Sequence, residues 1–206
     1  MKEETTNEKL ILQAAEEEFI SKGYNGAKTT AIARRAGVTH AMLHYYYRTK
    51  ENLFQKVFQE KIQMIADSFG KAFDENLPFE DTIRSFVEKH YDFVMENKNL
   101  INFVYNEIRA NKENMLILRS IISPKTNYIF QRFDTLIKQE VDKGNIRPTN
   151  SLELFMSTLT LNLGASIFFL INEVLAVAPE IEGSENLIKQ KKEQNVQFIL
   201  QSLRIK

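Results

Sequence analysis

The chain has 206 residues, of which 43% are hydrophobic and 26% charged, and it contains no cysteine. This composition is ordinary for a globular protein and leaves room for one domain or two small ones. The lack of cysteine excludes a disulfide framework, thiolate metal ligands and a cysteine nucleophile, and it suits a reducing cytoplasm, where we expect the protein to act. No apolar segment follows the polar first residues, so the sequence predicts no secretory signal peptide.

The formal net charge is zero, but basic residues are concentrated near the N-terminus. Residues 19–50 contain six lysines and arginines and no aspartate or glutamate. Such a block favours contact with a polyanion, although a solvated basic surface explains it equally well. The motifs within this segment therefore have to decide between the two interpretations.

Apolar residues recur with helical spacing along the chain, and glycine and proline separate the helical segments. We find neither an alternating strand pattern nor an internal repeat. Gly23 should stop the first helix, and Pro124 should kink or start the helix in which it lies. Threonines stand at the positions where three further helices should be capped, namely Thr29 or Thr30, Thr39 and Thr49. We therefore predict an all-α protein of about nine helices, over residues 7–22, 29–37, 39–47, 49–73, 79–96, 100–109, 115–143, 151–177 and 184–204.

One segment is long enough to be tested as a membrane span. Residues 154–172 carry no charge and approach the length that crosses a bilayer. Serine, threonine and asparagine interrupt the segment, however, and no basic cluster flanks it. We expect a buried or interface helix and no membrane association.

The most informative segment is residues 29–48, which predicts two short helices joined by a tight turn. Ala33 is small enough for two crossing helices to approach closely, and Gly37 supplies the left-handed backbone that the turn needs. The apolar positions that should form the buried side are Ile32, Ala36, Val38, Leu43 and Tyr47. This spacing is typical of a DNA-binding helix-turn-helix, whose second helix lies in the major groove.

Residues 10–58 resemble the N-terminal region of the tetracycline-repressor (TetR) family of transcription regulators. The matched positions are Phe19, Gly23-Tyr24, Thr29-Thr30, Ile32-Ala33, Ala36-Gly37-Val38-Thr39, Leu43, Tyr46-Tyr47 and Lys50-Glu51-Asn52-Leu53-Phe54. Beyond residue 60 only the number and lengths of the helices match. Ala41 replaces a frequent glycine, His44 a usual tyrosine and Tyr47 the commoner phenylalanine, so no base preference is transferred to this chain.

The resemblance implies a role for each aligned position. Phosphate contacts at the N-termini of two helices, where free amides and the helix dipole attract anions, are implied for Thr29 and Lys50. Hydroxyl contacts to the DNA backbone are implied for Thr39, Tyr45 and Tyr46. Contacts to base edges are implied for His40, Ala41 and His44.

Other kinds of site find less support in the sequence. His40 and His44 have the spacing of two metal ligands on one helical face, but no carboxylate or cysteine lies nearby to complete a metal site. We expect no cofactor. There is no phosphate-binding glycine loop and no order of residues typical of a catalytic triad, so we predict that the chain is not an enzyme. The alternative is a helical ligand carrier or enzyme with a fortuitous helix-turn-helix, which would not retain specific DNA at moderate salt.

Two features stand out after residue 50. The helix from about residue 151 is apolar around most of its circumference. The resemblance implies that the last two helices, over about 151–177 and 184–204, pair with the same two helices of a second copy in a homodimer. Aromatic and polar residues are also concentrated in the middle of the chain, and a cavity for a small apolar or aromatic effector is implied. Its candidate lining residues are His90, Phe93, Phe103, Tyr128, Asn162 and Phe169.

These predictions combine into one function. Residues 1–50 should form the DNA-binding domain, and residues 51–206 the effector-binding and dimerisation domain. We predict a repressor that binds a palindromic operator in double-stranded DNA as a dimer and is released by its effector. Activation in place of repression stays open.

Overall fold

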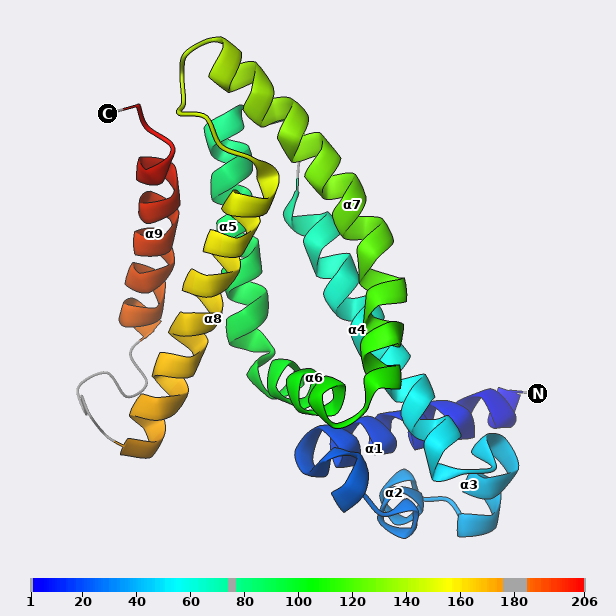
Figure 1. Ribbon diagram of the computed structural model, residues 1–206. Coiled ribbons are helices and arrows are strands. Elements are labelled where there is room, and N and C mark those ends of the chain that lie inside the picture. The colour runs from blue at the N-terminus through cyan, green and yellow to red at the C-terminus, as the bar shows by residue number, and fades with distance from the viewer. Residues whose placement is uncertain (1, 74–76, 176–184, 206) are drawn as a thin grey trace. The chain divides into compact units, whose positions relative to one another are not determined.

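The computed structural model describes residues 2–73, 77–175 and 185–205, which form helices and connecting turns with no β-strand among them (Figure 1). The helices in these ranges are α1 (Lys2–Gly26), α2 (Thr29–Ala36), α3 (His40–Tyr47), α4 (Lys50–Ala72), α5 (Phe79–Glu96), α6 (Lys98–Ala110), α7 (Lys112–Asp142), α8 (Ser151–Leu175) and α9 (Glu185–Ser202). The all-α prediction and the predicted order of helices are confirmed. The expected end at residue 177 and the expected start at residue 184 lie outside the described residues.

The helices form two compact units, each made of two chain segments. Unit 1 comprises Met1–Ile65 and Asn99–Ile122, and unit 2 comprises Ala66–Lys98 and Ser123–Lys206. The divisions fall inside α4, inside α7 and after the first residue of α6, so each of these helices belongs partly to each unit. Almost all of α6 and the start of α7 therefore belong to the same unit as α1–α3, which the sequence did not indicate. The predicted division of roles at residue 50 remains a prediction.

Helix α1 packs one apolar face into unit 1. Ile11, Ala14, Ala15 and Phe19 are buried at the spacing of one helical face. The backbone leaves helical geometry at Gly23 (φ 65°, ψ 175°), and one more helical turn follows to Gly26. This conformation is open essentially to glycine alone, so the predicted stop is present as a break inside α1.

The turn between α2 and α3 is built as predicted. Gly37 adopts the left-handed conformation (φ 69°, ψ 23°), and the N–H of Val38 donates to the carbonyl of Ala33 at 3.0 Å. Thr39 caps α3, because its hydroxyl accepts the N–H of Met42 at 3.2 Å. Thr49 caps α4 in the same way through the N–H of Asn52, at 3.1 Å.

The predicted threonine cap of α2 is wrong. Lys28 occupies the N-cap position, and its side chain has no acceptor to offer. The N–H of Lys28 lies 3.4 Å from Glu18 Oε1 of α1. Thr29 is instead the first helical residue, and its hydroxyl lies 3.0 Å from His40 Nε2. The side chain of Thr29 thus contacts the first residue of α3.

Aromatic rings join α1, α4 and α6 in the core of unit 1. The ring of Phe54 lies edge-on to Phe19 (5.2 Å between centroids) and to Tyr24 (4.9 Å). Phe103 of α6 lies 6.1 Å from Phe54 and 6.0 Å from Phe58, and it is almost fully buried. Edge-to-face aromatic pairs of this kind add to the stabilisation from buried area. Helix α6 is therefore packed against α4 in the core of unit 1.

A buried chain of polar side chains joins α5, α8 and α9 in unit 2. Asn162 of α8 donates to the carbonyl of Val87 at 3.0 Å and lies 2.9 Å from His90 Nδ1. Asn195 of α9 donates to Asn162 Oδ1 at 2.9 Å. An amide N–H can only donate, so Nδ1 of His90 is the acceptor and the neutral ring carries its proton on Nε2.

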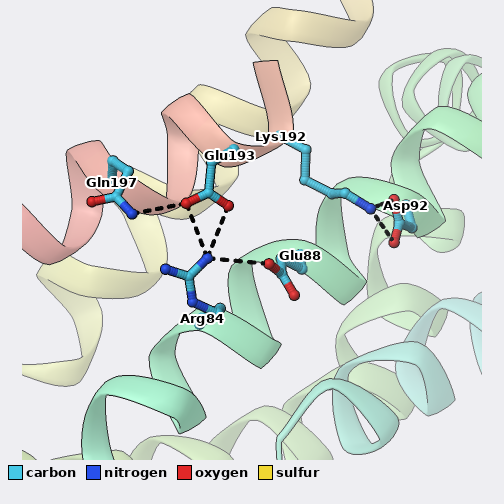
Figure 2. Close-up of polar contacts among 6 residues, drawn as sticks. All are labelled: Arg84, Glu88, Asp92, Lys192, Glu193 and Gln197. Atoms are coloured by element: carbon cyan, nitrogen blue, oxygen red, sulfur yellow. Dashed lines mark hydrogen bonds and ion pairs between the residues drawn. The ribbon is translucent and has the colours of Figure 1, made fainter. Parts of the chain in front are cut away.

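Two ion pairs also hold α9 against α5 (Figure 2). Arg84 contacts Glu193 at 2.9 Å, and Lys192 contacts Asp92 at 2.9 Å. Hydrogen bonds from Gln197 and Arg84 hold the pKa of Glu193 below its usual range. These partly exposed pairs fix the orientation of α9 and contribute little to stability.

Burial lowers the pKa of His90 to about 4. The folded chain keeps the ring neutral, whereas the unfolded chain takes up a proton below pH 6.5, so stability falls as the pH drops from 6.5 towards 4. We expect this group to cost about 2 kcal/mol at pH 5 relative to pH 7. His90→Gln keeps an acceptor for Asn162 and cannot titrate. The free energy of unfolding, measured with urea at fixed protein concentration, should show this loss between pH 7 and pH 5 in the wild type and not in His90→Gln. If the free energies of the two proteins fall in parallel with pH, the lowered pKa of His90 is contradicted.

Helix α7 passes through Pro124 and ends where predicted. Pro124 lies inside the helix and not at its start. Gly144 follows the end of α7 in the left-handed conformation (φ 73°), with its N–H on the carbonyl of Val141 at 2.9 Å.

Candidate DNA interface

The recognition helix α3 has a buried side and an exposed side. Leu43 and Tyr47 are buried in unit 1. His40, Ala41 and His44, the residues expected to face base edges, are all exposed. Their spacing places them on one side of the helix, so the structure gathers them on a single surface. Contact with bases remains a prediction, and this exposure is what it requires.

Hydrogen bonds hold the two histidines of this surface in place. His44 Nδ1 lies 2.8 Å from the carbonyl oxygen of Arg48, which can only accept, so Nδ1 carries the proton. In the neutral ring Nε2 of His44 is then an acceptor, the partner that an amino group of adenine or cytosine requires. The ring of His40 lies edge-on to it at 4.6 Å, and Nε2 of His40 contacts Thr29. The rings are therefore positioned before any ligand arrives.

Lys50, an expected phosphate contact, begins α4. Its ammonium nitrogen lies 4.6 Å from the centre of the Tyr24 ring. The hydroxyl of Tyr24 hydrogen-bonds Glu51, and this bond raises the pKa of Tyr24. The first turn of α4 thus combines the positive end of the helix dipole with a lysine held by an aromatic ring, an arrangement suited to an anion.

The residues expected to make hydroxyl contacts lie along α3 and at its N-cap. Tyr45 is 75% exposed, and its ring is edge-on to that of Tyr46 at 5.4 Å. Thr39 accepts a backbone N–H through its oxygen, which leaves its own O–H free to donate. Arg35 in α2 is paired with Glu17, whereas the neighbouring Arg34 is exposed.

A metal site at the histidine pair finds no further ligand. Within the ranges that the structure describes, no group of three or more histidine, aspartate or glutamate side chains is placed to hold a metal ion. His40 and His44 instead contact Thr29 and a backbone carbonyl, as described above.

The candidate effector residues are spread over both units. His90 and Asn162 are hydrogen-bonded to each other inside unit 2, and Phe93 is half-buried on the same helix as His90. Tyr128 is 57% exposed. Phe103 belongs to the core of unit 1, whereas the other candidate residues belong to unit 2. The structure joins His90 and Asn162 by a hydrogen bond, and effector binding by the six stays a prediction.

Helix α8 has two opposite faces. Leu154, Thr158, Asn162 and Ala165 form a buried face. The opposite face exposes large apolar side chains, namely Leu152, Met156, Ile167, Phe168 and Ile171. Its segment Ser151–Phe169 is long and apolar enough to cross a membrane by length and composition, with 22% of it buried.

A groove of about 430 Å³ lies between α8 and α9, and Figure 1 shows these two helices side by side. Gly164 and Phe168 line it from α8, and Leu187 and Gln194 from α9. Phe169, a candidate effector residue, also lines this groove, with the ammonium of Lys98 5.8 Å from its ring. Together with the exposed apolar face of α8, the groove gives the α8–α9 pair a continuous apolar surface.

An all-helical fold with an exposed recognition helix defines the class of helix-turn-helix transcription regulators. Residues 11–57 match the sequence profile of the family described as bacterial regulatory proteins, tetR family. The chain belongs to this family, and it is a TetR-family transcriptional regulator. Regulators of this family bind DNA operators and work as dimers.

Relatives from several bacteria carry related descriptions. The chain is 22% identical over 147 residues to the fatty acid metabolism regulator protein of Bacillus subtilis, covering 71% of this chain and 74% of that protein. It is 30% identical over 84 residues to the transcriptional activator FasR of Mycolicibacterium smegmatis, covering 41% and 38%. A solved structure of a candidate fatty acid metabolism regulator from Clostridium perfringens superposes with a TM-score of 0.66 at 20% identity, over 96% of this chain and 100% of that one. A tetR-family protein from Rhodococcus gives 0.67 at 19% identity, over 97% and 98%. These structural similarities show the fold.

Proposed function

We propose that the protein is a repressor that binds a palindromic operator as a homodimer and is released by a small effector. The observation that supports it most is the exposed surface of α3, on which His40, Ala41 and His44 lie together above a buried Leu43. In this proposal α3 enters the major groove, and Thr29 and Lys50 contact the phosphates beside it.

The exposed apolar surface of α8 and α9 supports the proposed dimer. Monomers rarely expose apolar patches of this extent, and two copies related by a two-fold axis would cover it. Gly164 has open space around it, so a helix from a second copy can approach closely there. A two-fold dimer carries two recognition helices and would read half-sites about one helical turn, or a multiple, apart.

We further propose an effector with a long apolar chain, in the chemical class of fatty acids. Two lines support it: the aromatic and apolar composition of unit 2 and the descriptions of the Bacillus and Clostridium relatives as fatty acid metabolism regulators. In the same proposal the regulated genes encode proteins that act on fatty acids. The relative described as an activator makes activation the second possibility, in which the effector would strengthen operator binding.

The proposal is tested by titrating the protein with fatty acids of increasing chain length, with and without operator DNA. A ligand shifts the DNA equilibrium only through its different affinity for the bound and released forms. A coupling of about 1–3 kcal/mol would weaken operator binding roughly 5- to 150-fold, and operator would weaken fatty acid binding by the same factor. A sugar of similar size serves as the control ligand.

Three outcomes separate the alternatives. Equal fatty acid affinity in both titrations would show a bound molecule that is not an effector. Tighter operator binding in the presence of fatty acid would indicate an activator. A protein that binds fatty acid and retains no specific DNA at moderate salt would be the helical carrier.

A further inference from the structure

The carboxylate of Glu107 lies almost fully buried in unit 1, where it reaches from α6 to the break in α1. Glu107 is 7% exposed, and its Oε1 accepts the backbone N–H of Tyr24 at 2.7 Å. The two residues are 83 positions apart in the chain. Such a buried contact between distant segments asks for an explanation, because burying a carboxylate is costly without strong partners.

The break at Gly23 explains what Glu107 does. After Gly23 leaves helical geometry, a new helical turn starts, and the first amide of such a turn has no partner within the helix. Glu107 supplies the acceptor and a negative charge at the positive end of that turn, so it acts as an N-terminal cap provided by another helix. A Cβ at position 23 would meet Glu107 Oε1 at 3.1 Å, so glycine also leaves the space that the carboxylate uses.

Tyr24 connects this cap to the candidate DNA interface. The residue that receives the cap also holds the ammonium of Lys50 over its ring and hydrogen-bonds Glu51. Helix α6 is also bonded to α7 through Asn114, whose side-chain amide donates to the backbone carbonyl of Glu107 at 3.2 Å. The contacts thus run from α7 through Glu107 and Tyr24 to the first residue of α4.

We propose that Glu107 is a positioning residue for DNA binding: by capping the turn at Tyr24, it holds the ring that places Lys50 for its phosphate contact. The inference rests on the proposed function of Lys50. It assigns α6 a part in the DNA-binding apparatus.

The test compares two substitutions of Glu107 that have similar size and differ in hydrogen bonding. Glu107→Gln retains an acceptor for Tyr24, whereas Glu107→Leu has none. The readout is the slope of log K for operator binding against log salt, which changes by about 0.9 for each phosphate contact. A dimer carries one Lys50 in each copy, so we expect Glu107→Leu and Lys50→Ala each to reduce the magnitude of the slope by about 1.8, which is about 0.9 for each copy. Glu107→Gln should leave the slope unchanged, and the double variant Glu107→Leu/Lys50→Ala should show no further reduction. A merely structural role of Glu107 predicts weaker binding with an unchanged slope.

A second variant and a DNA-free measurement keep the inference testable if Glu107→Leu does not fold. Tyr24→Leu leaves Glu107 and the backbone bond in place, removes the ring, and should lower the slope as Lys50→Ala does. In free protein, the NMR shift of the Lys50 side chain should show the ring current of Tyr24 in the wild type and in Glu107→Gln, and lose it in Tyr24→Leu.

The outcomes distinguish this inference from the proposed function. An unchanged slope in Lys50→Ala would show that Lys50 makes no phosphate contact, which overturns both the role proposed for Lys50 and the inference about Glu107. A reduced slope in Lys50→Ala together with wild-type slopes in Glu107→Leu and Tyr24→Leu would overturn only the role of Glu107.

Discussion

Ala41→Glu should abolish specific operator binding and leave the protein folded. Ala41 is exposed on α3 between His40 and His44, so a glutamate there would bring a carboxylate against phosphates and base edges. Like charges placed together in an interface cost several kcal/mol, which corresponds to a loss of about 100-fold or more. Because the side chain is exposed, stability should change by no more than about 0.5 kcal/mol. Band-shift titration and thermal unfolding measure the two quantities.

A matched control separates the site from the charge. Thr135→Glu adds the same charge at an exposed position of α7 in unit 2 and should bind operator almost as the wild type does. Unchanged operator affinity in Ala41→Glu would show that α3 does not enter the groove. Loss of helicity in that variant would show that Ala41 has a structural role that its exposure does not indicate.

Phe168→Arg should convert the protein to monomers and weaken operator binding by about 100-fold or more. Phe168 lines the groove between α8 and α9 and is 48% exposed in the single chain. A second copy covering this surface would bury the introduced guanidinium without a partner, at a cost that the interface cannot offset. A monomer binds each half-site independently, whereas two linked binding modules typically bind with an affinity about 10²- to 10⁴-fold higher than that of a single module. Sedimentation at micromolar concentration and operator titration provide the measurements.

Leu116→Arg is the control for this variant. Leu116, at 65%, is more exposed than Phe168. It lies on α7 in unit 1, whereas α8 and α9 belong to unit 2. It should leave the dimer intact. Wild-type protein that sediments as a monomer, or Phe168→Arg that remains a dimer, would refute the proposed interface. Ala165 is a poorer site for the test, because it is 5% exposed and packs within its own chain.

Local patterns were enough to predict most of the fold. Pro78 marks the start of α5 at Phe79, and Gly37 and Thr39 mark the turn of the helix-turn-helix, because backbone geometry at these points depends on the residue itself. The cap of α2 was predicted wrongly, although the helix begins at Thr29 within the predicted range. Lys28 occupies the N-cap position and its N–H lies 3.4 Å from Glu18 Oε1 of another helix, whereas threonine was the better local candidate.

Contacts between distant segments could not be predicted in this way. In the sequence Phe103 does not differ from the other aromatic residues of the helices. It is the packing of α6 against Phe54 that assigns Phe103 to unit 1. His90 and Asn162 were expected to meet a ligand, since polar residues in apolar helices need partners. In the structure each finds the other, and Asn195 completes the chain. The position of Glu107 beside Tyr24 has no local pattern at all.

The discontinuity of unit 1 bears on how this family member can be engineered. A fragment that ends at Ile65 would leave behind Phe103, Glu107 and Asn114, and with them one side of its aromatic core. Such a fragment should be poorly folded, and a chimera that exchanges only residues 1–50 with a relative would pair a foreign α1 with the resident α6. A transplant designed to move operator specificity onto another sensor should therefore carry residues 99–122 along with the N-terminal segment, or confine its changes to the exposed side of α3.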